Sequence, residues 1–333
     1  MDPLTQGVLG ASLSLSVSKK QHLVVAGVIG LLAGMSPDLD VLIRSQSDPL
    51  LFLEFHRQFT HSLFFIPFGS LLCALVLHLL FGKRQGLSFK QSWLYSALGF
   101  STHALLDACT SYGTQLLWPL TSERYSWNLV SVIDPIFTLP LFILIIMAVL
   151  KRNPRFARIA MLWVFMYPTL GLIQRERAEE AGWQLALERQ HAPIQLVAKP
   201  TFANILVWKV LYETEGRFHV DAVRVGSSVK TYHGESIAKL NVVRNFPWLD
   251  LSAQQAQDIQ RFHKFSNGFI AQDPNDDHRI IDVRYSMVPN QINALWSIQL
   301  SPSATMDAHV EYATHRDNSP ASRQAFLELL MDY

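Results

Sequence analysis

The feature that most constrains this chain is an uninterrupted apolar run from Ser62 to Phe81. These 20 residues contain no Asp, Glu, Lys or Arg. About 20 mostly apolar residues are what an α-helix needs to cross the hydrocarbon core of a bilayer. A helix is favoured there because it satisfies its backbone hydrogen bonds within the segment. The run therefore predicts a membrane-spanning helix.

Five further apolar segments occur within the first 173 residues, so we predict a bundle of about six transmembrane helices. The first two segments are short and rich in Gly, Ala and Ser, which suits close helix packing. The first lacks the basic flank and cleavage site of a secretory signal peptide, and we expect it to be retained. The six predicted helices cover residues 4–17, 22–35, 62–81, 92–109, 130–150 and 159–173.

After residue 173 the long apolar runs stop, and the pattern becomes that of a water-soluble domain. Residues 204–212 and 217–225 are rich in β-branched and aromatic side chains and flank a polar turn at 213–216, which predicts a β-hairpin. Residues 280–287 and 294–300 predict a second pair of strands. Both pairs indicate antiparallel sheet.

Two helices complete the prediction for the second half, a polar amphipathic one over residues 176–190 and another over residues 252–265, capped by Ser252. Only 17% of the whole chain is charged, against about 25% in typical soluble domains. The predicted fold class is mainly α: a polytopic transmembrane helical bundle over residues 1–173, followed by a small soluble α+β domain over residues 174–333.

Basic residues are unevenly distributed among the predicted connections. Because Lys and Arg tend to remain in the cytoplasm, the connections with more basic residues are predicted to lie on the cytoplasmic side. Both the amino terminus and residues 174–333 then face outward. In a bacterium this means a multi-pass inner (plasma) membrane protein with a periplasmic C-terminal domain. Connections after the first, third and fifth helices hold Lys19, Lys20, Lys83, Arg84, Lys90, Lys151, Arg152, Arg155 and Arg158, and the opposite ones hold Arg44, Arg57 and Arg124.

Net charge and cysteine usage exclude some classes of protein. The net charge is +1, and no basic stripe offers a surface for phosphate backbones, so we expect no nucleic-acid partner. Cys73 and Cys109 lie inside apolar segments and predict two buried thiols rather than a disulfide.

Four polar clusters interrupt the apolar half, and the predicted topology places all four at the outer face. Since loop charges alone set the sides, this convergence supports a single site. Ionisable residues at membrane depth are functional candidates by default. The clusters are 37–40, with Asp38 and Asp40; 56–62, with His56, Arg57 and His61; 102–113, with His103 and Asp107; and 123–135, with Arg124 and Asp134.

The spacing of these residues suits metal binding. His103 and Asp107 are four apart, so on a helix they share one face and can bind one ion or two adjacent ions. His56 and His61 are five apart, which requires a bend, and we expect Thr60 to cap the helix that follows.

Three His and three Asp are enough for a one- or two-metal hydrolytic centre. Without a cysteine ligand, zinc, manganese, magnesium and iron all remain open, and zinc is the ion we predict first. Asp38 or Asp40 could act as general base, while Arg57 and Arg124 could clamp an anionic substrate. The predicted metal ligands are Asp38, Asp40, His56, His61, His103 and Asp107.

Each cluster alone also has a structural interpretation. His103 and Asp107 could form a hydrogen bond that holds helices together. Asp38 and Asp40 could be solvated caps at a helix end, and the histidines of residues 56–62 could be interfacial. The functional interpretation therefore depends on the clusters jointly.

With these residues the chain resembles the YdjM family, described as inner-membrane, metal-dependent hydrolases. The resemblance covers roughly residues 1–150 and implies that the six predicted ligands form the metal site, with Gln6 and Arg124 nearby. Gln58 stands where we expect glycine, and Gln6 where some members have histidine. The motifs are Met1-Asp2-Pro3-Leu4-Thr5-Gln6-Gly7, Pro37-Asp38-Leu39-Asp40, His56-Arg57-x-x-Thr60-His61-Ser62 and His103-x-x-Leu106-Asp107-x-x-Thr110-x-x-Gly113.

The leading hypothesis is a membrane-bound, metal-dependent hydrolase acting at the outer face on a lipid-linked or phosphorylated small substrate, with membrane lipid as a partner. The alternative is a non-catalytic, metal-stabilised membrane scaffold or a transport component. An intramembrane metalloprotease would lead us to expect His-Glu-x-x-His on a helix, which does not occur in the sequence. A glycosyltransferase argued from Asp38-x-Asp40 alone is weaker, because two carboxylates at that spacing are common by chance.

Overall fold

The computed structural model describes residues 1–331, and its internal contacts divide the chain into two compact units. Unit 1 comprises Met1–Leu42, Phe55–Ile173 and Phe202–Ile205. Unit 2 comprises Ile43–Glu54, Gln174–Thr201 and the chain from Leu206 on. Each unit thus includes a short segment from the other half of the sequence.

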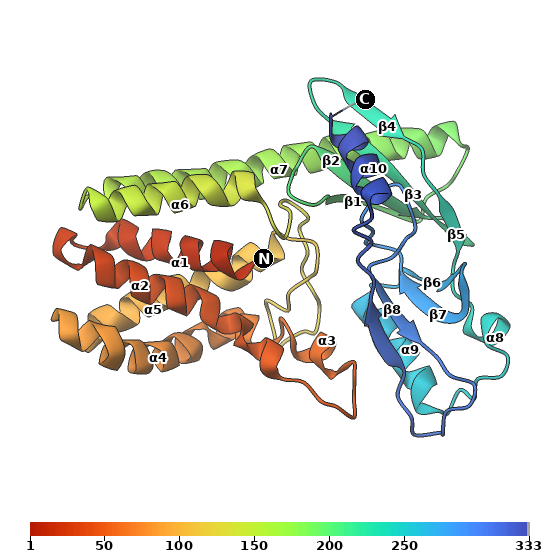
Figure 1. The fold of residues 1–333 in the computed structure, drawn as a ribbon, viewed down its shortest axis with the longest axis horizontal. Helices are drawn as coiled ribbons and strands as arrows, with labels where there is room; N and C mark the ends of the chain where they lie inside the picture. Colours follow the sequence, from red (N-terminus) through yellow and green to blue (C-terminus); the bar gives the residue numbers. More distant parts are fainter. Residues whose placement is uncertain (332–333) are drawn as a thin grey trace. The chain divides into compact units, whose positions relative to one another are not determined.

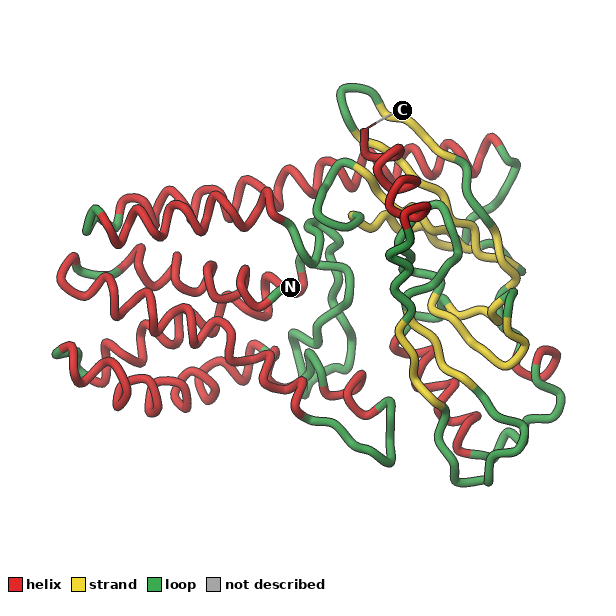
Figure 2. Tube along the Cα trace, in the orientation of Figure 1, coloured by secondary structure: helices red, strands yellow, loops and turns green. Residues whose placement is uncertain are grey.

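Unit 1 is a helical bundle (Figures 1 and 2). Each of the six predicted apolar segments coincides with a helix. Three stretches among the described residues are long and apolar enough to cross a membrane, namely Lys20–Leu42, Leu63–Gln85 and Arg155–Glu188, and Pro135–Leu150 is apolar but shorter. Its helices are α1 (Pro3–Val17), α2 (Leu23–Met35), α4 (Ile66–Leu77), α5 (Phe89–Ala108), α6 (Pro135–Leu150) and the first part of α7 (Arg155–Glu188), with short helical turns η1 (Lys20–His22), η2 (Ser36–Leu42), η3 (Phe59–His61), η4 (Leu63–Phe65), η5 (His78–Gly82) and η6 (Lys83–Gln85). The short helix α3 (Leu51–Phe55) belongs to unit 2 except for its last residue.

Side-chain caps set where three of these helices begin. Asp2 accepts from the backbone N–H of Thr5, and Asp134 from that of Phe137. Both helices have proline at the first position, where its fixed φ is favourable. Ser88 starts α5 with a capping box.

The prediction of separate helices over 159–173 and 176–190 is wrong, because α7 is one helix of 34 residues. Residues 173–176 are Ile-Gln-Arg-Glu, which contain neither glycine nor proline to end a helix. The change from apolar to polar sequence alters the surroundings that suit the helix surface, but it does not interrupt the backbone hydrogen bonds of the helix. The unit boundary, between Ile173 and Gln174, falls inside this helix.

Glycines allow α1, α2 and α5 to pack backbone against backbone. A Cβ atom on Gly10 or on Gly99 would collide with the carbonyl oxygen of Gly30, and one on Gly34 would lie 2.8 Å from the carbonyl oxygen of Gln6. Small residues at helix crossings permit this approach in membrane bundles. The predicted close packing of the first two helices is therefore confirmed, and α5 joins it.

Large apolar side chains point outward on the longer helices. Phe68 is 66% exposed, and Phe165 is 70% exposed. In water such exposed apolar surface would favour aggregation, whereas lipid accommodates it. This pattern and the apolar helices make the chain an integral membrane protein.

Unit 2 contains two antiparallel sheets (Figure 2). The predicted hairpin is confirmed as the pair β2–β3, and the second predicted strand pair is confirmed as β7–β8, although β7 ends at Asp282 rather than at residue 287. The first sheet has the order β1-β2-β3-β4 with β5 paired to β3, and the second has the order β6-β7-β8-β9. The elements are β1 (Gln195–Pro200), β2 (Val207–Glu213), β3 (Arg217–Val225), β4 (Val229–Tyr232), β5 (Ser236–Ala238), α8 (Val242–Asn245), α9 (Gln254–Phe265), β6 (Ile270–Asp273), β7 (Asp276–Asp282), β8 (Trp296–Gln299), β9 (Glu311–Thr314) and α10 (Pro320–Met331).

Two details of the sequence-based predictions differ from the structure. Helix α9 begins at Gln254 with Ala253 at the cap position, so Ser252 is not its cap. Ser252 bonds instead to the Asp250 carboxylate, with its hydroxyl 2.7 Å away. The two cysteines are free thiols, as predicted, although both are only partly buried.

The first sheet buries two lysines directly opposite each other. Lys199 on β1 is the cross-strand partner of Lys209 on β2, and both are less than 7% exposed. Lys209 donates to the Ser286 hydroxyl (2.8 Å) and to the Gln291 carbonyl (3.0 Å). Burial lowers the pKa of each ammonium group to about 7. Like charges directly opposite each other destabilise a sheet.

Unit 2 should therefore become more stable as pH rises from about 7 to 10. In that range the unfolded chain keeps the lysine protons that the folded chain has released, so raising the pH favours folding. Lys199→Met should stabilise the β1–β2 pair near pH 7 by on the order of 2 kcal/mol. Hydrogen exchange of residues 195–213, corrected for intrinsic rates, measures both effects. Lys230→Met, at an exposed position on β4, is the control and should change neither.

Candidate metal centre

Local chain geometry brings the first two polar clusters to one end of unit 1. Pro37 follows α2 closely and discourages regular helix before it, and the chain continues as the 3₁₀ turn η2, which carries Asp38 and Asp40. After α3 the chain reverses at Arg57, whose φ is +63°. A non-glycine residue holds this conformation only where its surroundings fix it, and here Asp40 Oδ2 accepts from the Arg57 N–H at 3.0 Å.

The predicted bend between His56 and His61 is present, but its cap is different. Thr60 and His61 lie in the 3₁₀ turn η3, and Ser62 caps the following turn by accepting from the Phe64 N–H. The prediction that Thr60 caps the next helix is therefore wrong. The Thr60 hydroxyl instead donates to Asp40 Oδ2 at 2.7 Å, because the tight turn directs it towards η2.

Four side chains from three elements converge on one point. The group is Asp38 from η2, His61 from η3, and His103 and Asp107 from α5, and one ligand atom of each lies within 4.8 Å of the others. His61 Nε2 is 3.3 Å from Asp107 Oδ2 and 3.5 Å from Asp38 Oδ1. His103 Nε2 is 3.3 Å from the same Asp38 oxygen. His103 and Asp107 share one face of α5, as their spacing predicted.

Hydrogen bonds orient both imidazoles of this group towards its centre. His103 Nδ1 lies 2.6 Å from the Gly34 carbonyl oxygen, so this nitrogen carries the proton and donates. His61 Nδ1 lies 3.2 Å from Asp40 Oδ2, and in the neutral ring it donates in the same way. Each Nε2 then carries a lone pair that points towards the other ligand atoms. Such hydrogen bonds to the second ring nitrogen are the usual way proteins fix metal-binding histidines.

The converging atoms lack hydrogen-bond partners. His61 Nε2, His103 Nε2 and Asp107 Oδ2 are all buried and form no hydrogen bond. Buried polar atoms are nearly always bonded, so each exception needs an explanation. Two nitrogens and two carboxylate oxygens suit a divalent ion. The residues present therefore fit a metal, and this group could hold one.

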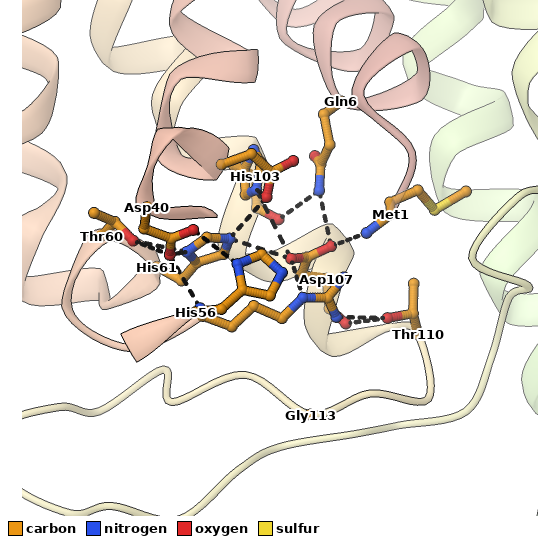
Figure 3. Close-up of polar contacts among 12 residues, drawn as sticks. Met1, Gln6, Asp40, His56, Thr60, His61, His103, Asp107, Thr110 and Gly113 are labelled. Carbon is orange, nitrogen blue, oxygen red and sulfur yellow. Dashed lines mark hydrogen bonds and ion pairs between the residues drawn. The ribbon is translucent and has the colours of Figure 1, made fainter. Parts of the chain in front are cut away.

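A second group shares a residue with the first. Asp38, Asp40 and His56 also place one ligand atom each within 4.8 Å of one another. Asp40 lies 2.7 Å from His56 Nδ1 (Figure 3). Asp38 belongs to both groups.

The two arginines make internal contacts. Arg57 Nε lies 3.1 Å from Asp107 Oδ2 without forming a hydrogen bond, and its NH1 donates to the Thr110 hydroxyl at 3.3 Å. Arg124 donates to the carbonyl oxygens of His56 and Gly113. Both thus hold the loops around the site, and their role as a clamp on an anionic substrate stays a prediction.

Sequence reasoning missed several partners of the site. Asp107 Oδ1 accepts from Gln6 Nε2 at 3.0 Å and from the amino group of Met1 (Figure 3). Gln6 was expected near the site from the resemblance alone. The Gly34 carbonyl, which holds His103, is a backbone atom and leaves no signal in residue type.

A membrane bundle that gathers His and Asp at one end of its helices defines this chain as an integral membrane protein with a candidate metal centre. The sequence model of the YdjM inner membrane protein family matches residues 1–178. This is more than half of the chain, and the protein belongs to that family of inner membrane proteins.

Two relatives extend the comparison. The chain is 24% identical over 300 residues to the uncharacterised protein YfhP of Bacillus subtilis (strain 168), covering 86% of this chain and 87% of the relative. Because 300 residues exceed the family match, this similarity includes part of unit 2. It is 35% identical over 107 residues to the inner membrane protein YbcI of Escherichia coli (strain K12), covering 31% of this chain and 60% of the relative. No solved structure matches.

Proposed function

We propose that this protein is a metal-dependent hydrolase whose active site is the Asp38–His61–His103–Asp107 group. The observation that carries the proposal is the convergence of three buried, unbonded ligand atoms from His61, His103 and Asp107. In the neutral rings the Nε2 lone pairs of His61 and His103 face carboxylate oxygens, an arrangement that a bound cation would satisfy.

The residues of the site would have two roles in hydrolysis, metal binding and proton transfer. A divalent ion held there, with zinc favoured, would lower the pKa of water and polarise the scissile group. Asp38 is the ligand with an accessible side chain, 18% exposed against 0% for the other three. It is therefore the residue best placed to take a proton from an entering water. Asp40 holds His61 in position.

The substrate we propose is a lipid-linked phosphoester at the periplasmic surface. The connections α1–α2, α4–α5 and α6–α7 and the first turns of α5 and α7 hold the nine basic residues and lie at one end of unit 1, and the candidate site lies at the other (Figure 1). The positive-inside tendency supports a multi-pass topology with the basic end in the cytoplasm. A site at the opposite end would sit at headgroup depth, and unit 2 would be periplasmic.

Turnover tests this proposal directly. Detergent-purified protein, loaded with zinc, manganese or magnesium, is assayed against lipid phosphoesters, soluble phosphoesters, carboxylic esters and peptides. We expect hydrolysis of a lipid phosphoester that His103→Ala/Asp107→Ala abolishes. If no substrate is hydrolysed with any of the ions, the proposal is wrong. If only the soluble phosphoester is hydrolysed, the proposed substrate is a phosphoester that is not linked to lipid.

A non-catalytic scaffold is the second candidate, and the pairing of Asp107 supports it. That carboxylate lies beside Arg57 and the Met1 amino group, so its charge is compensated within the protein. Buried ion pairs of this kind can hold helices together without any reaction. This function predicts a folded protein that turns over nothing and whose stability falls when metal is removed.

A further inference from the structure

A short segment of chain links unit 2 to the candidate metal centre. Residues 43–54 connect η2, which carries Asp38 and Asp40, to the turn that carries His56 and His61. By its contacts this segment belongs to unit 2, whereas the residues at both of its ends belong to unit 1. The segment therefore joins the two halves of the site by way of the other unit.

Apolar packing anchors the segment in unit 2. Leu50 and Leu53 are 1% and 7% exposed and belong to a core cluster that includes Phe246 and Phe262. Phe52 packs edge-on against Tyr312, with ring centroids 5.2 Å apart. These contacts anchor residues 50–53 of the segment in the apolar core of unit 2.

One arginine of helix α9 clamps both acidic residues of the segment. Arg261 binds Asp48 with two parallel bonds of 2.9 and 2.8 Å and binds Glu54 at 2.6 Å. Its position is fixed in turn by Asp258 on the same helix, at 2.9 Å. Paired bonds between a planar guanidinium and a carboxylate set orientation as well as distance.

The clamp lies very close in sequence to the metal-site turn. Only Phe55 separates Glu54 from His56, so at under about 4 Å per residue the two residues lie close together along the chain. The Asp40 carboxylate contacts this turn at two points, His56 Nδ1 at 2.7 Å and the Arg57 N–H at 3.0 Å. The turn is therefore held from two sides.

We infer that Arg261 is a positioning residue for the candidate metal centre, acting through residues 43–54 on His56 and His61. Arg261 lies outside both groups of candidate ligands and would act on them along the chain. The consequence for catalysis rests on the proposed function, whereas the coupling itself does not.

Hydrogen exchange tests the coupling in the full-length, metal-free protein. Arg261→Ala should increase exchange at residues 55–62 as well as at 43–54, and Asp48→Asn, which breaks the same pair from the other side, should do likewise. The matched control is Arg279→Ala. Arg279 also binds two acids, Asp273 and Asp276, in unit 2, and its loss should leave residues 55–62 unchanged. Loosening confined to residues 43–54 in both test variants would overturn the inference.

A Co²⁺ titration adds a readout that general destabilisation would not give. Arg261→Ala should weaken Co²⁺ binding roughly tenfold, as loss of a supporting residue typically does, and should shift the visible absorption of the bound ion. Arg261→Lys should restore part of the affinity, and Arg279→Ala should retain all of it. Unchanged affinity and spectrum in Arg261→Ala would count against positioning. If the wild type binds no Co²⁺ and hydrolyses nothing, the proposed function fails, and the exchange result still decides the coupling.

Discussion

Replacing His61 and His103 together with alanine should abolish metal binding. The two imidazoles supply both nitrogen ligands of the buried group, and two carboxylates alone would not hold zinc against competing water. Elemental analysis of detergent-purified protein should find about one to two equivalents of metal in the wild type and under about a tenth of one in the variant.

His78→Ala provides the matched control for this experiment. His78 lies in the same unit, and its Nδ1 is bonded to the Ser92 hydroxyl at 2.9 Å. Its loss should leave metal content unchanged. A folded wild type that contains no metal would contradict the prediction and favour the structural interpretation, in which these polar residues bind one another.

The core of the site could be predicted because its chemistry is local in sequence. His103 and Asp107 need only the helical repeat to share a face, and α5 supplies it. Pro37 fixes the turn that carries Asp38 and Asp40. The convergence of these elements could not be predicted from local sequence. It was predicted from the alternation of basic loops, which placed all of the polar clusters at one face.

The parts that were missed or wrong depend on distant or backbone partners. Residue type gives no signal that a carbonyl of α2 will hold His103, or that the Asp40 carboxylate will take up the Thr60 hydroxyl that was expected to cap a helix. The attachment of residues 43–54 to unit 2 arises from contacts with Arg261, more than 200 residues away along the chain. The same reasoning explains the contact of Arg57 with Asp107, which the sequence did not predict, while its role as a clamp on an anionic substrate stays a prediction.

Asp40→Asn should weaken metal binding by about ten- to a hundredfold without removing it, the range typical of a lost supporting carboxylate. Asp40 is close to four groups at once: His56 Nδ1, the Arg57 N–H, the Thr60 hydroxyl and His61 Nδ1. An asparagine offers one acceptor oxygen where the carboxylate offers two, so some of these contacts are lost. His61 then loses its orientation while its Nε2 remains able to bind.

The comparison of Asp40→Asn with Asp38→Asn separates orientation from ligation. Asp38 Oδ1 faces the Nε2 atoms of His61 and His103, so its loss should remove a ligand and abolish turnover. Asp134→Asn controls for loss of a buried carboxylate, because Asp134 is 1% exposed and is bonded to Tyr167 rather than to the site. It should lower stability and leave metal affinity unchanged. Equal loss of metal in Asp40→Asn and Asp38→Asn would instead make Asp40 a ligand, and the Asp38–Asp40–His56 group would then be a second ion site rather than the support of the first.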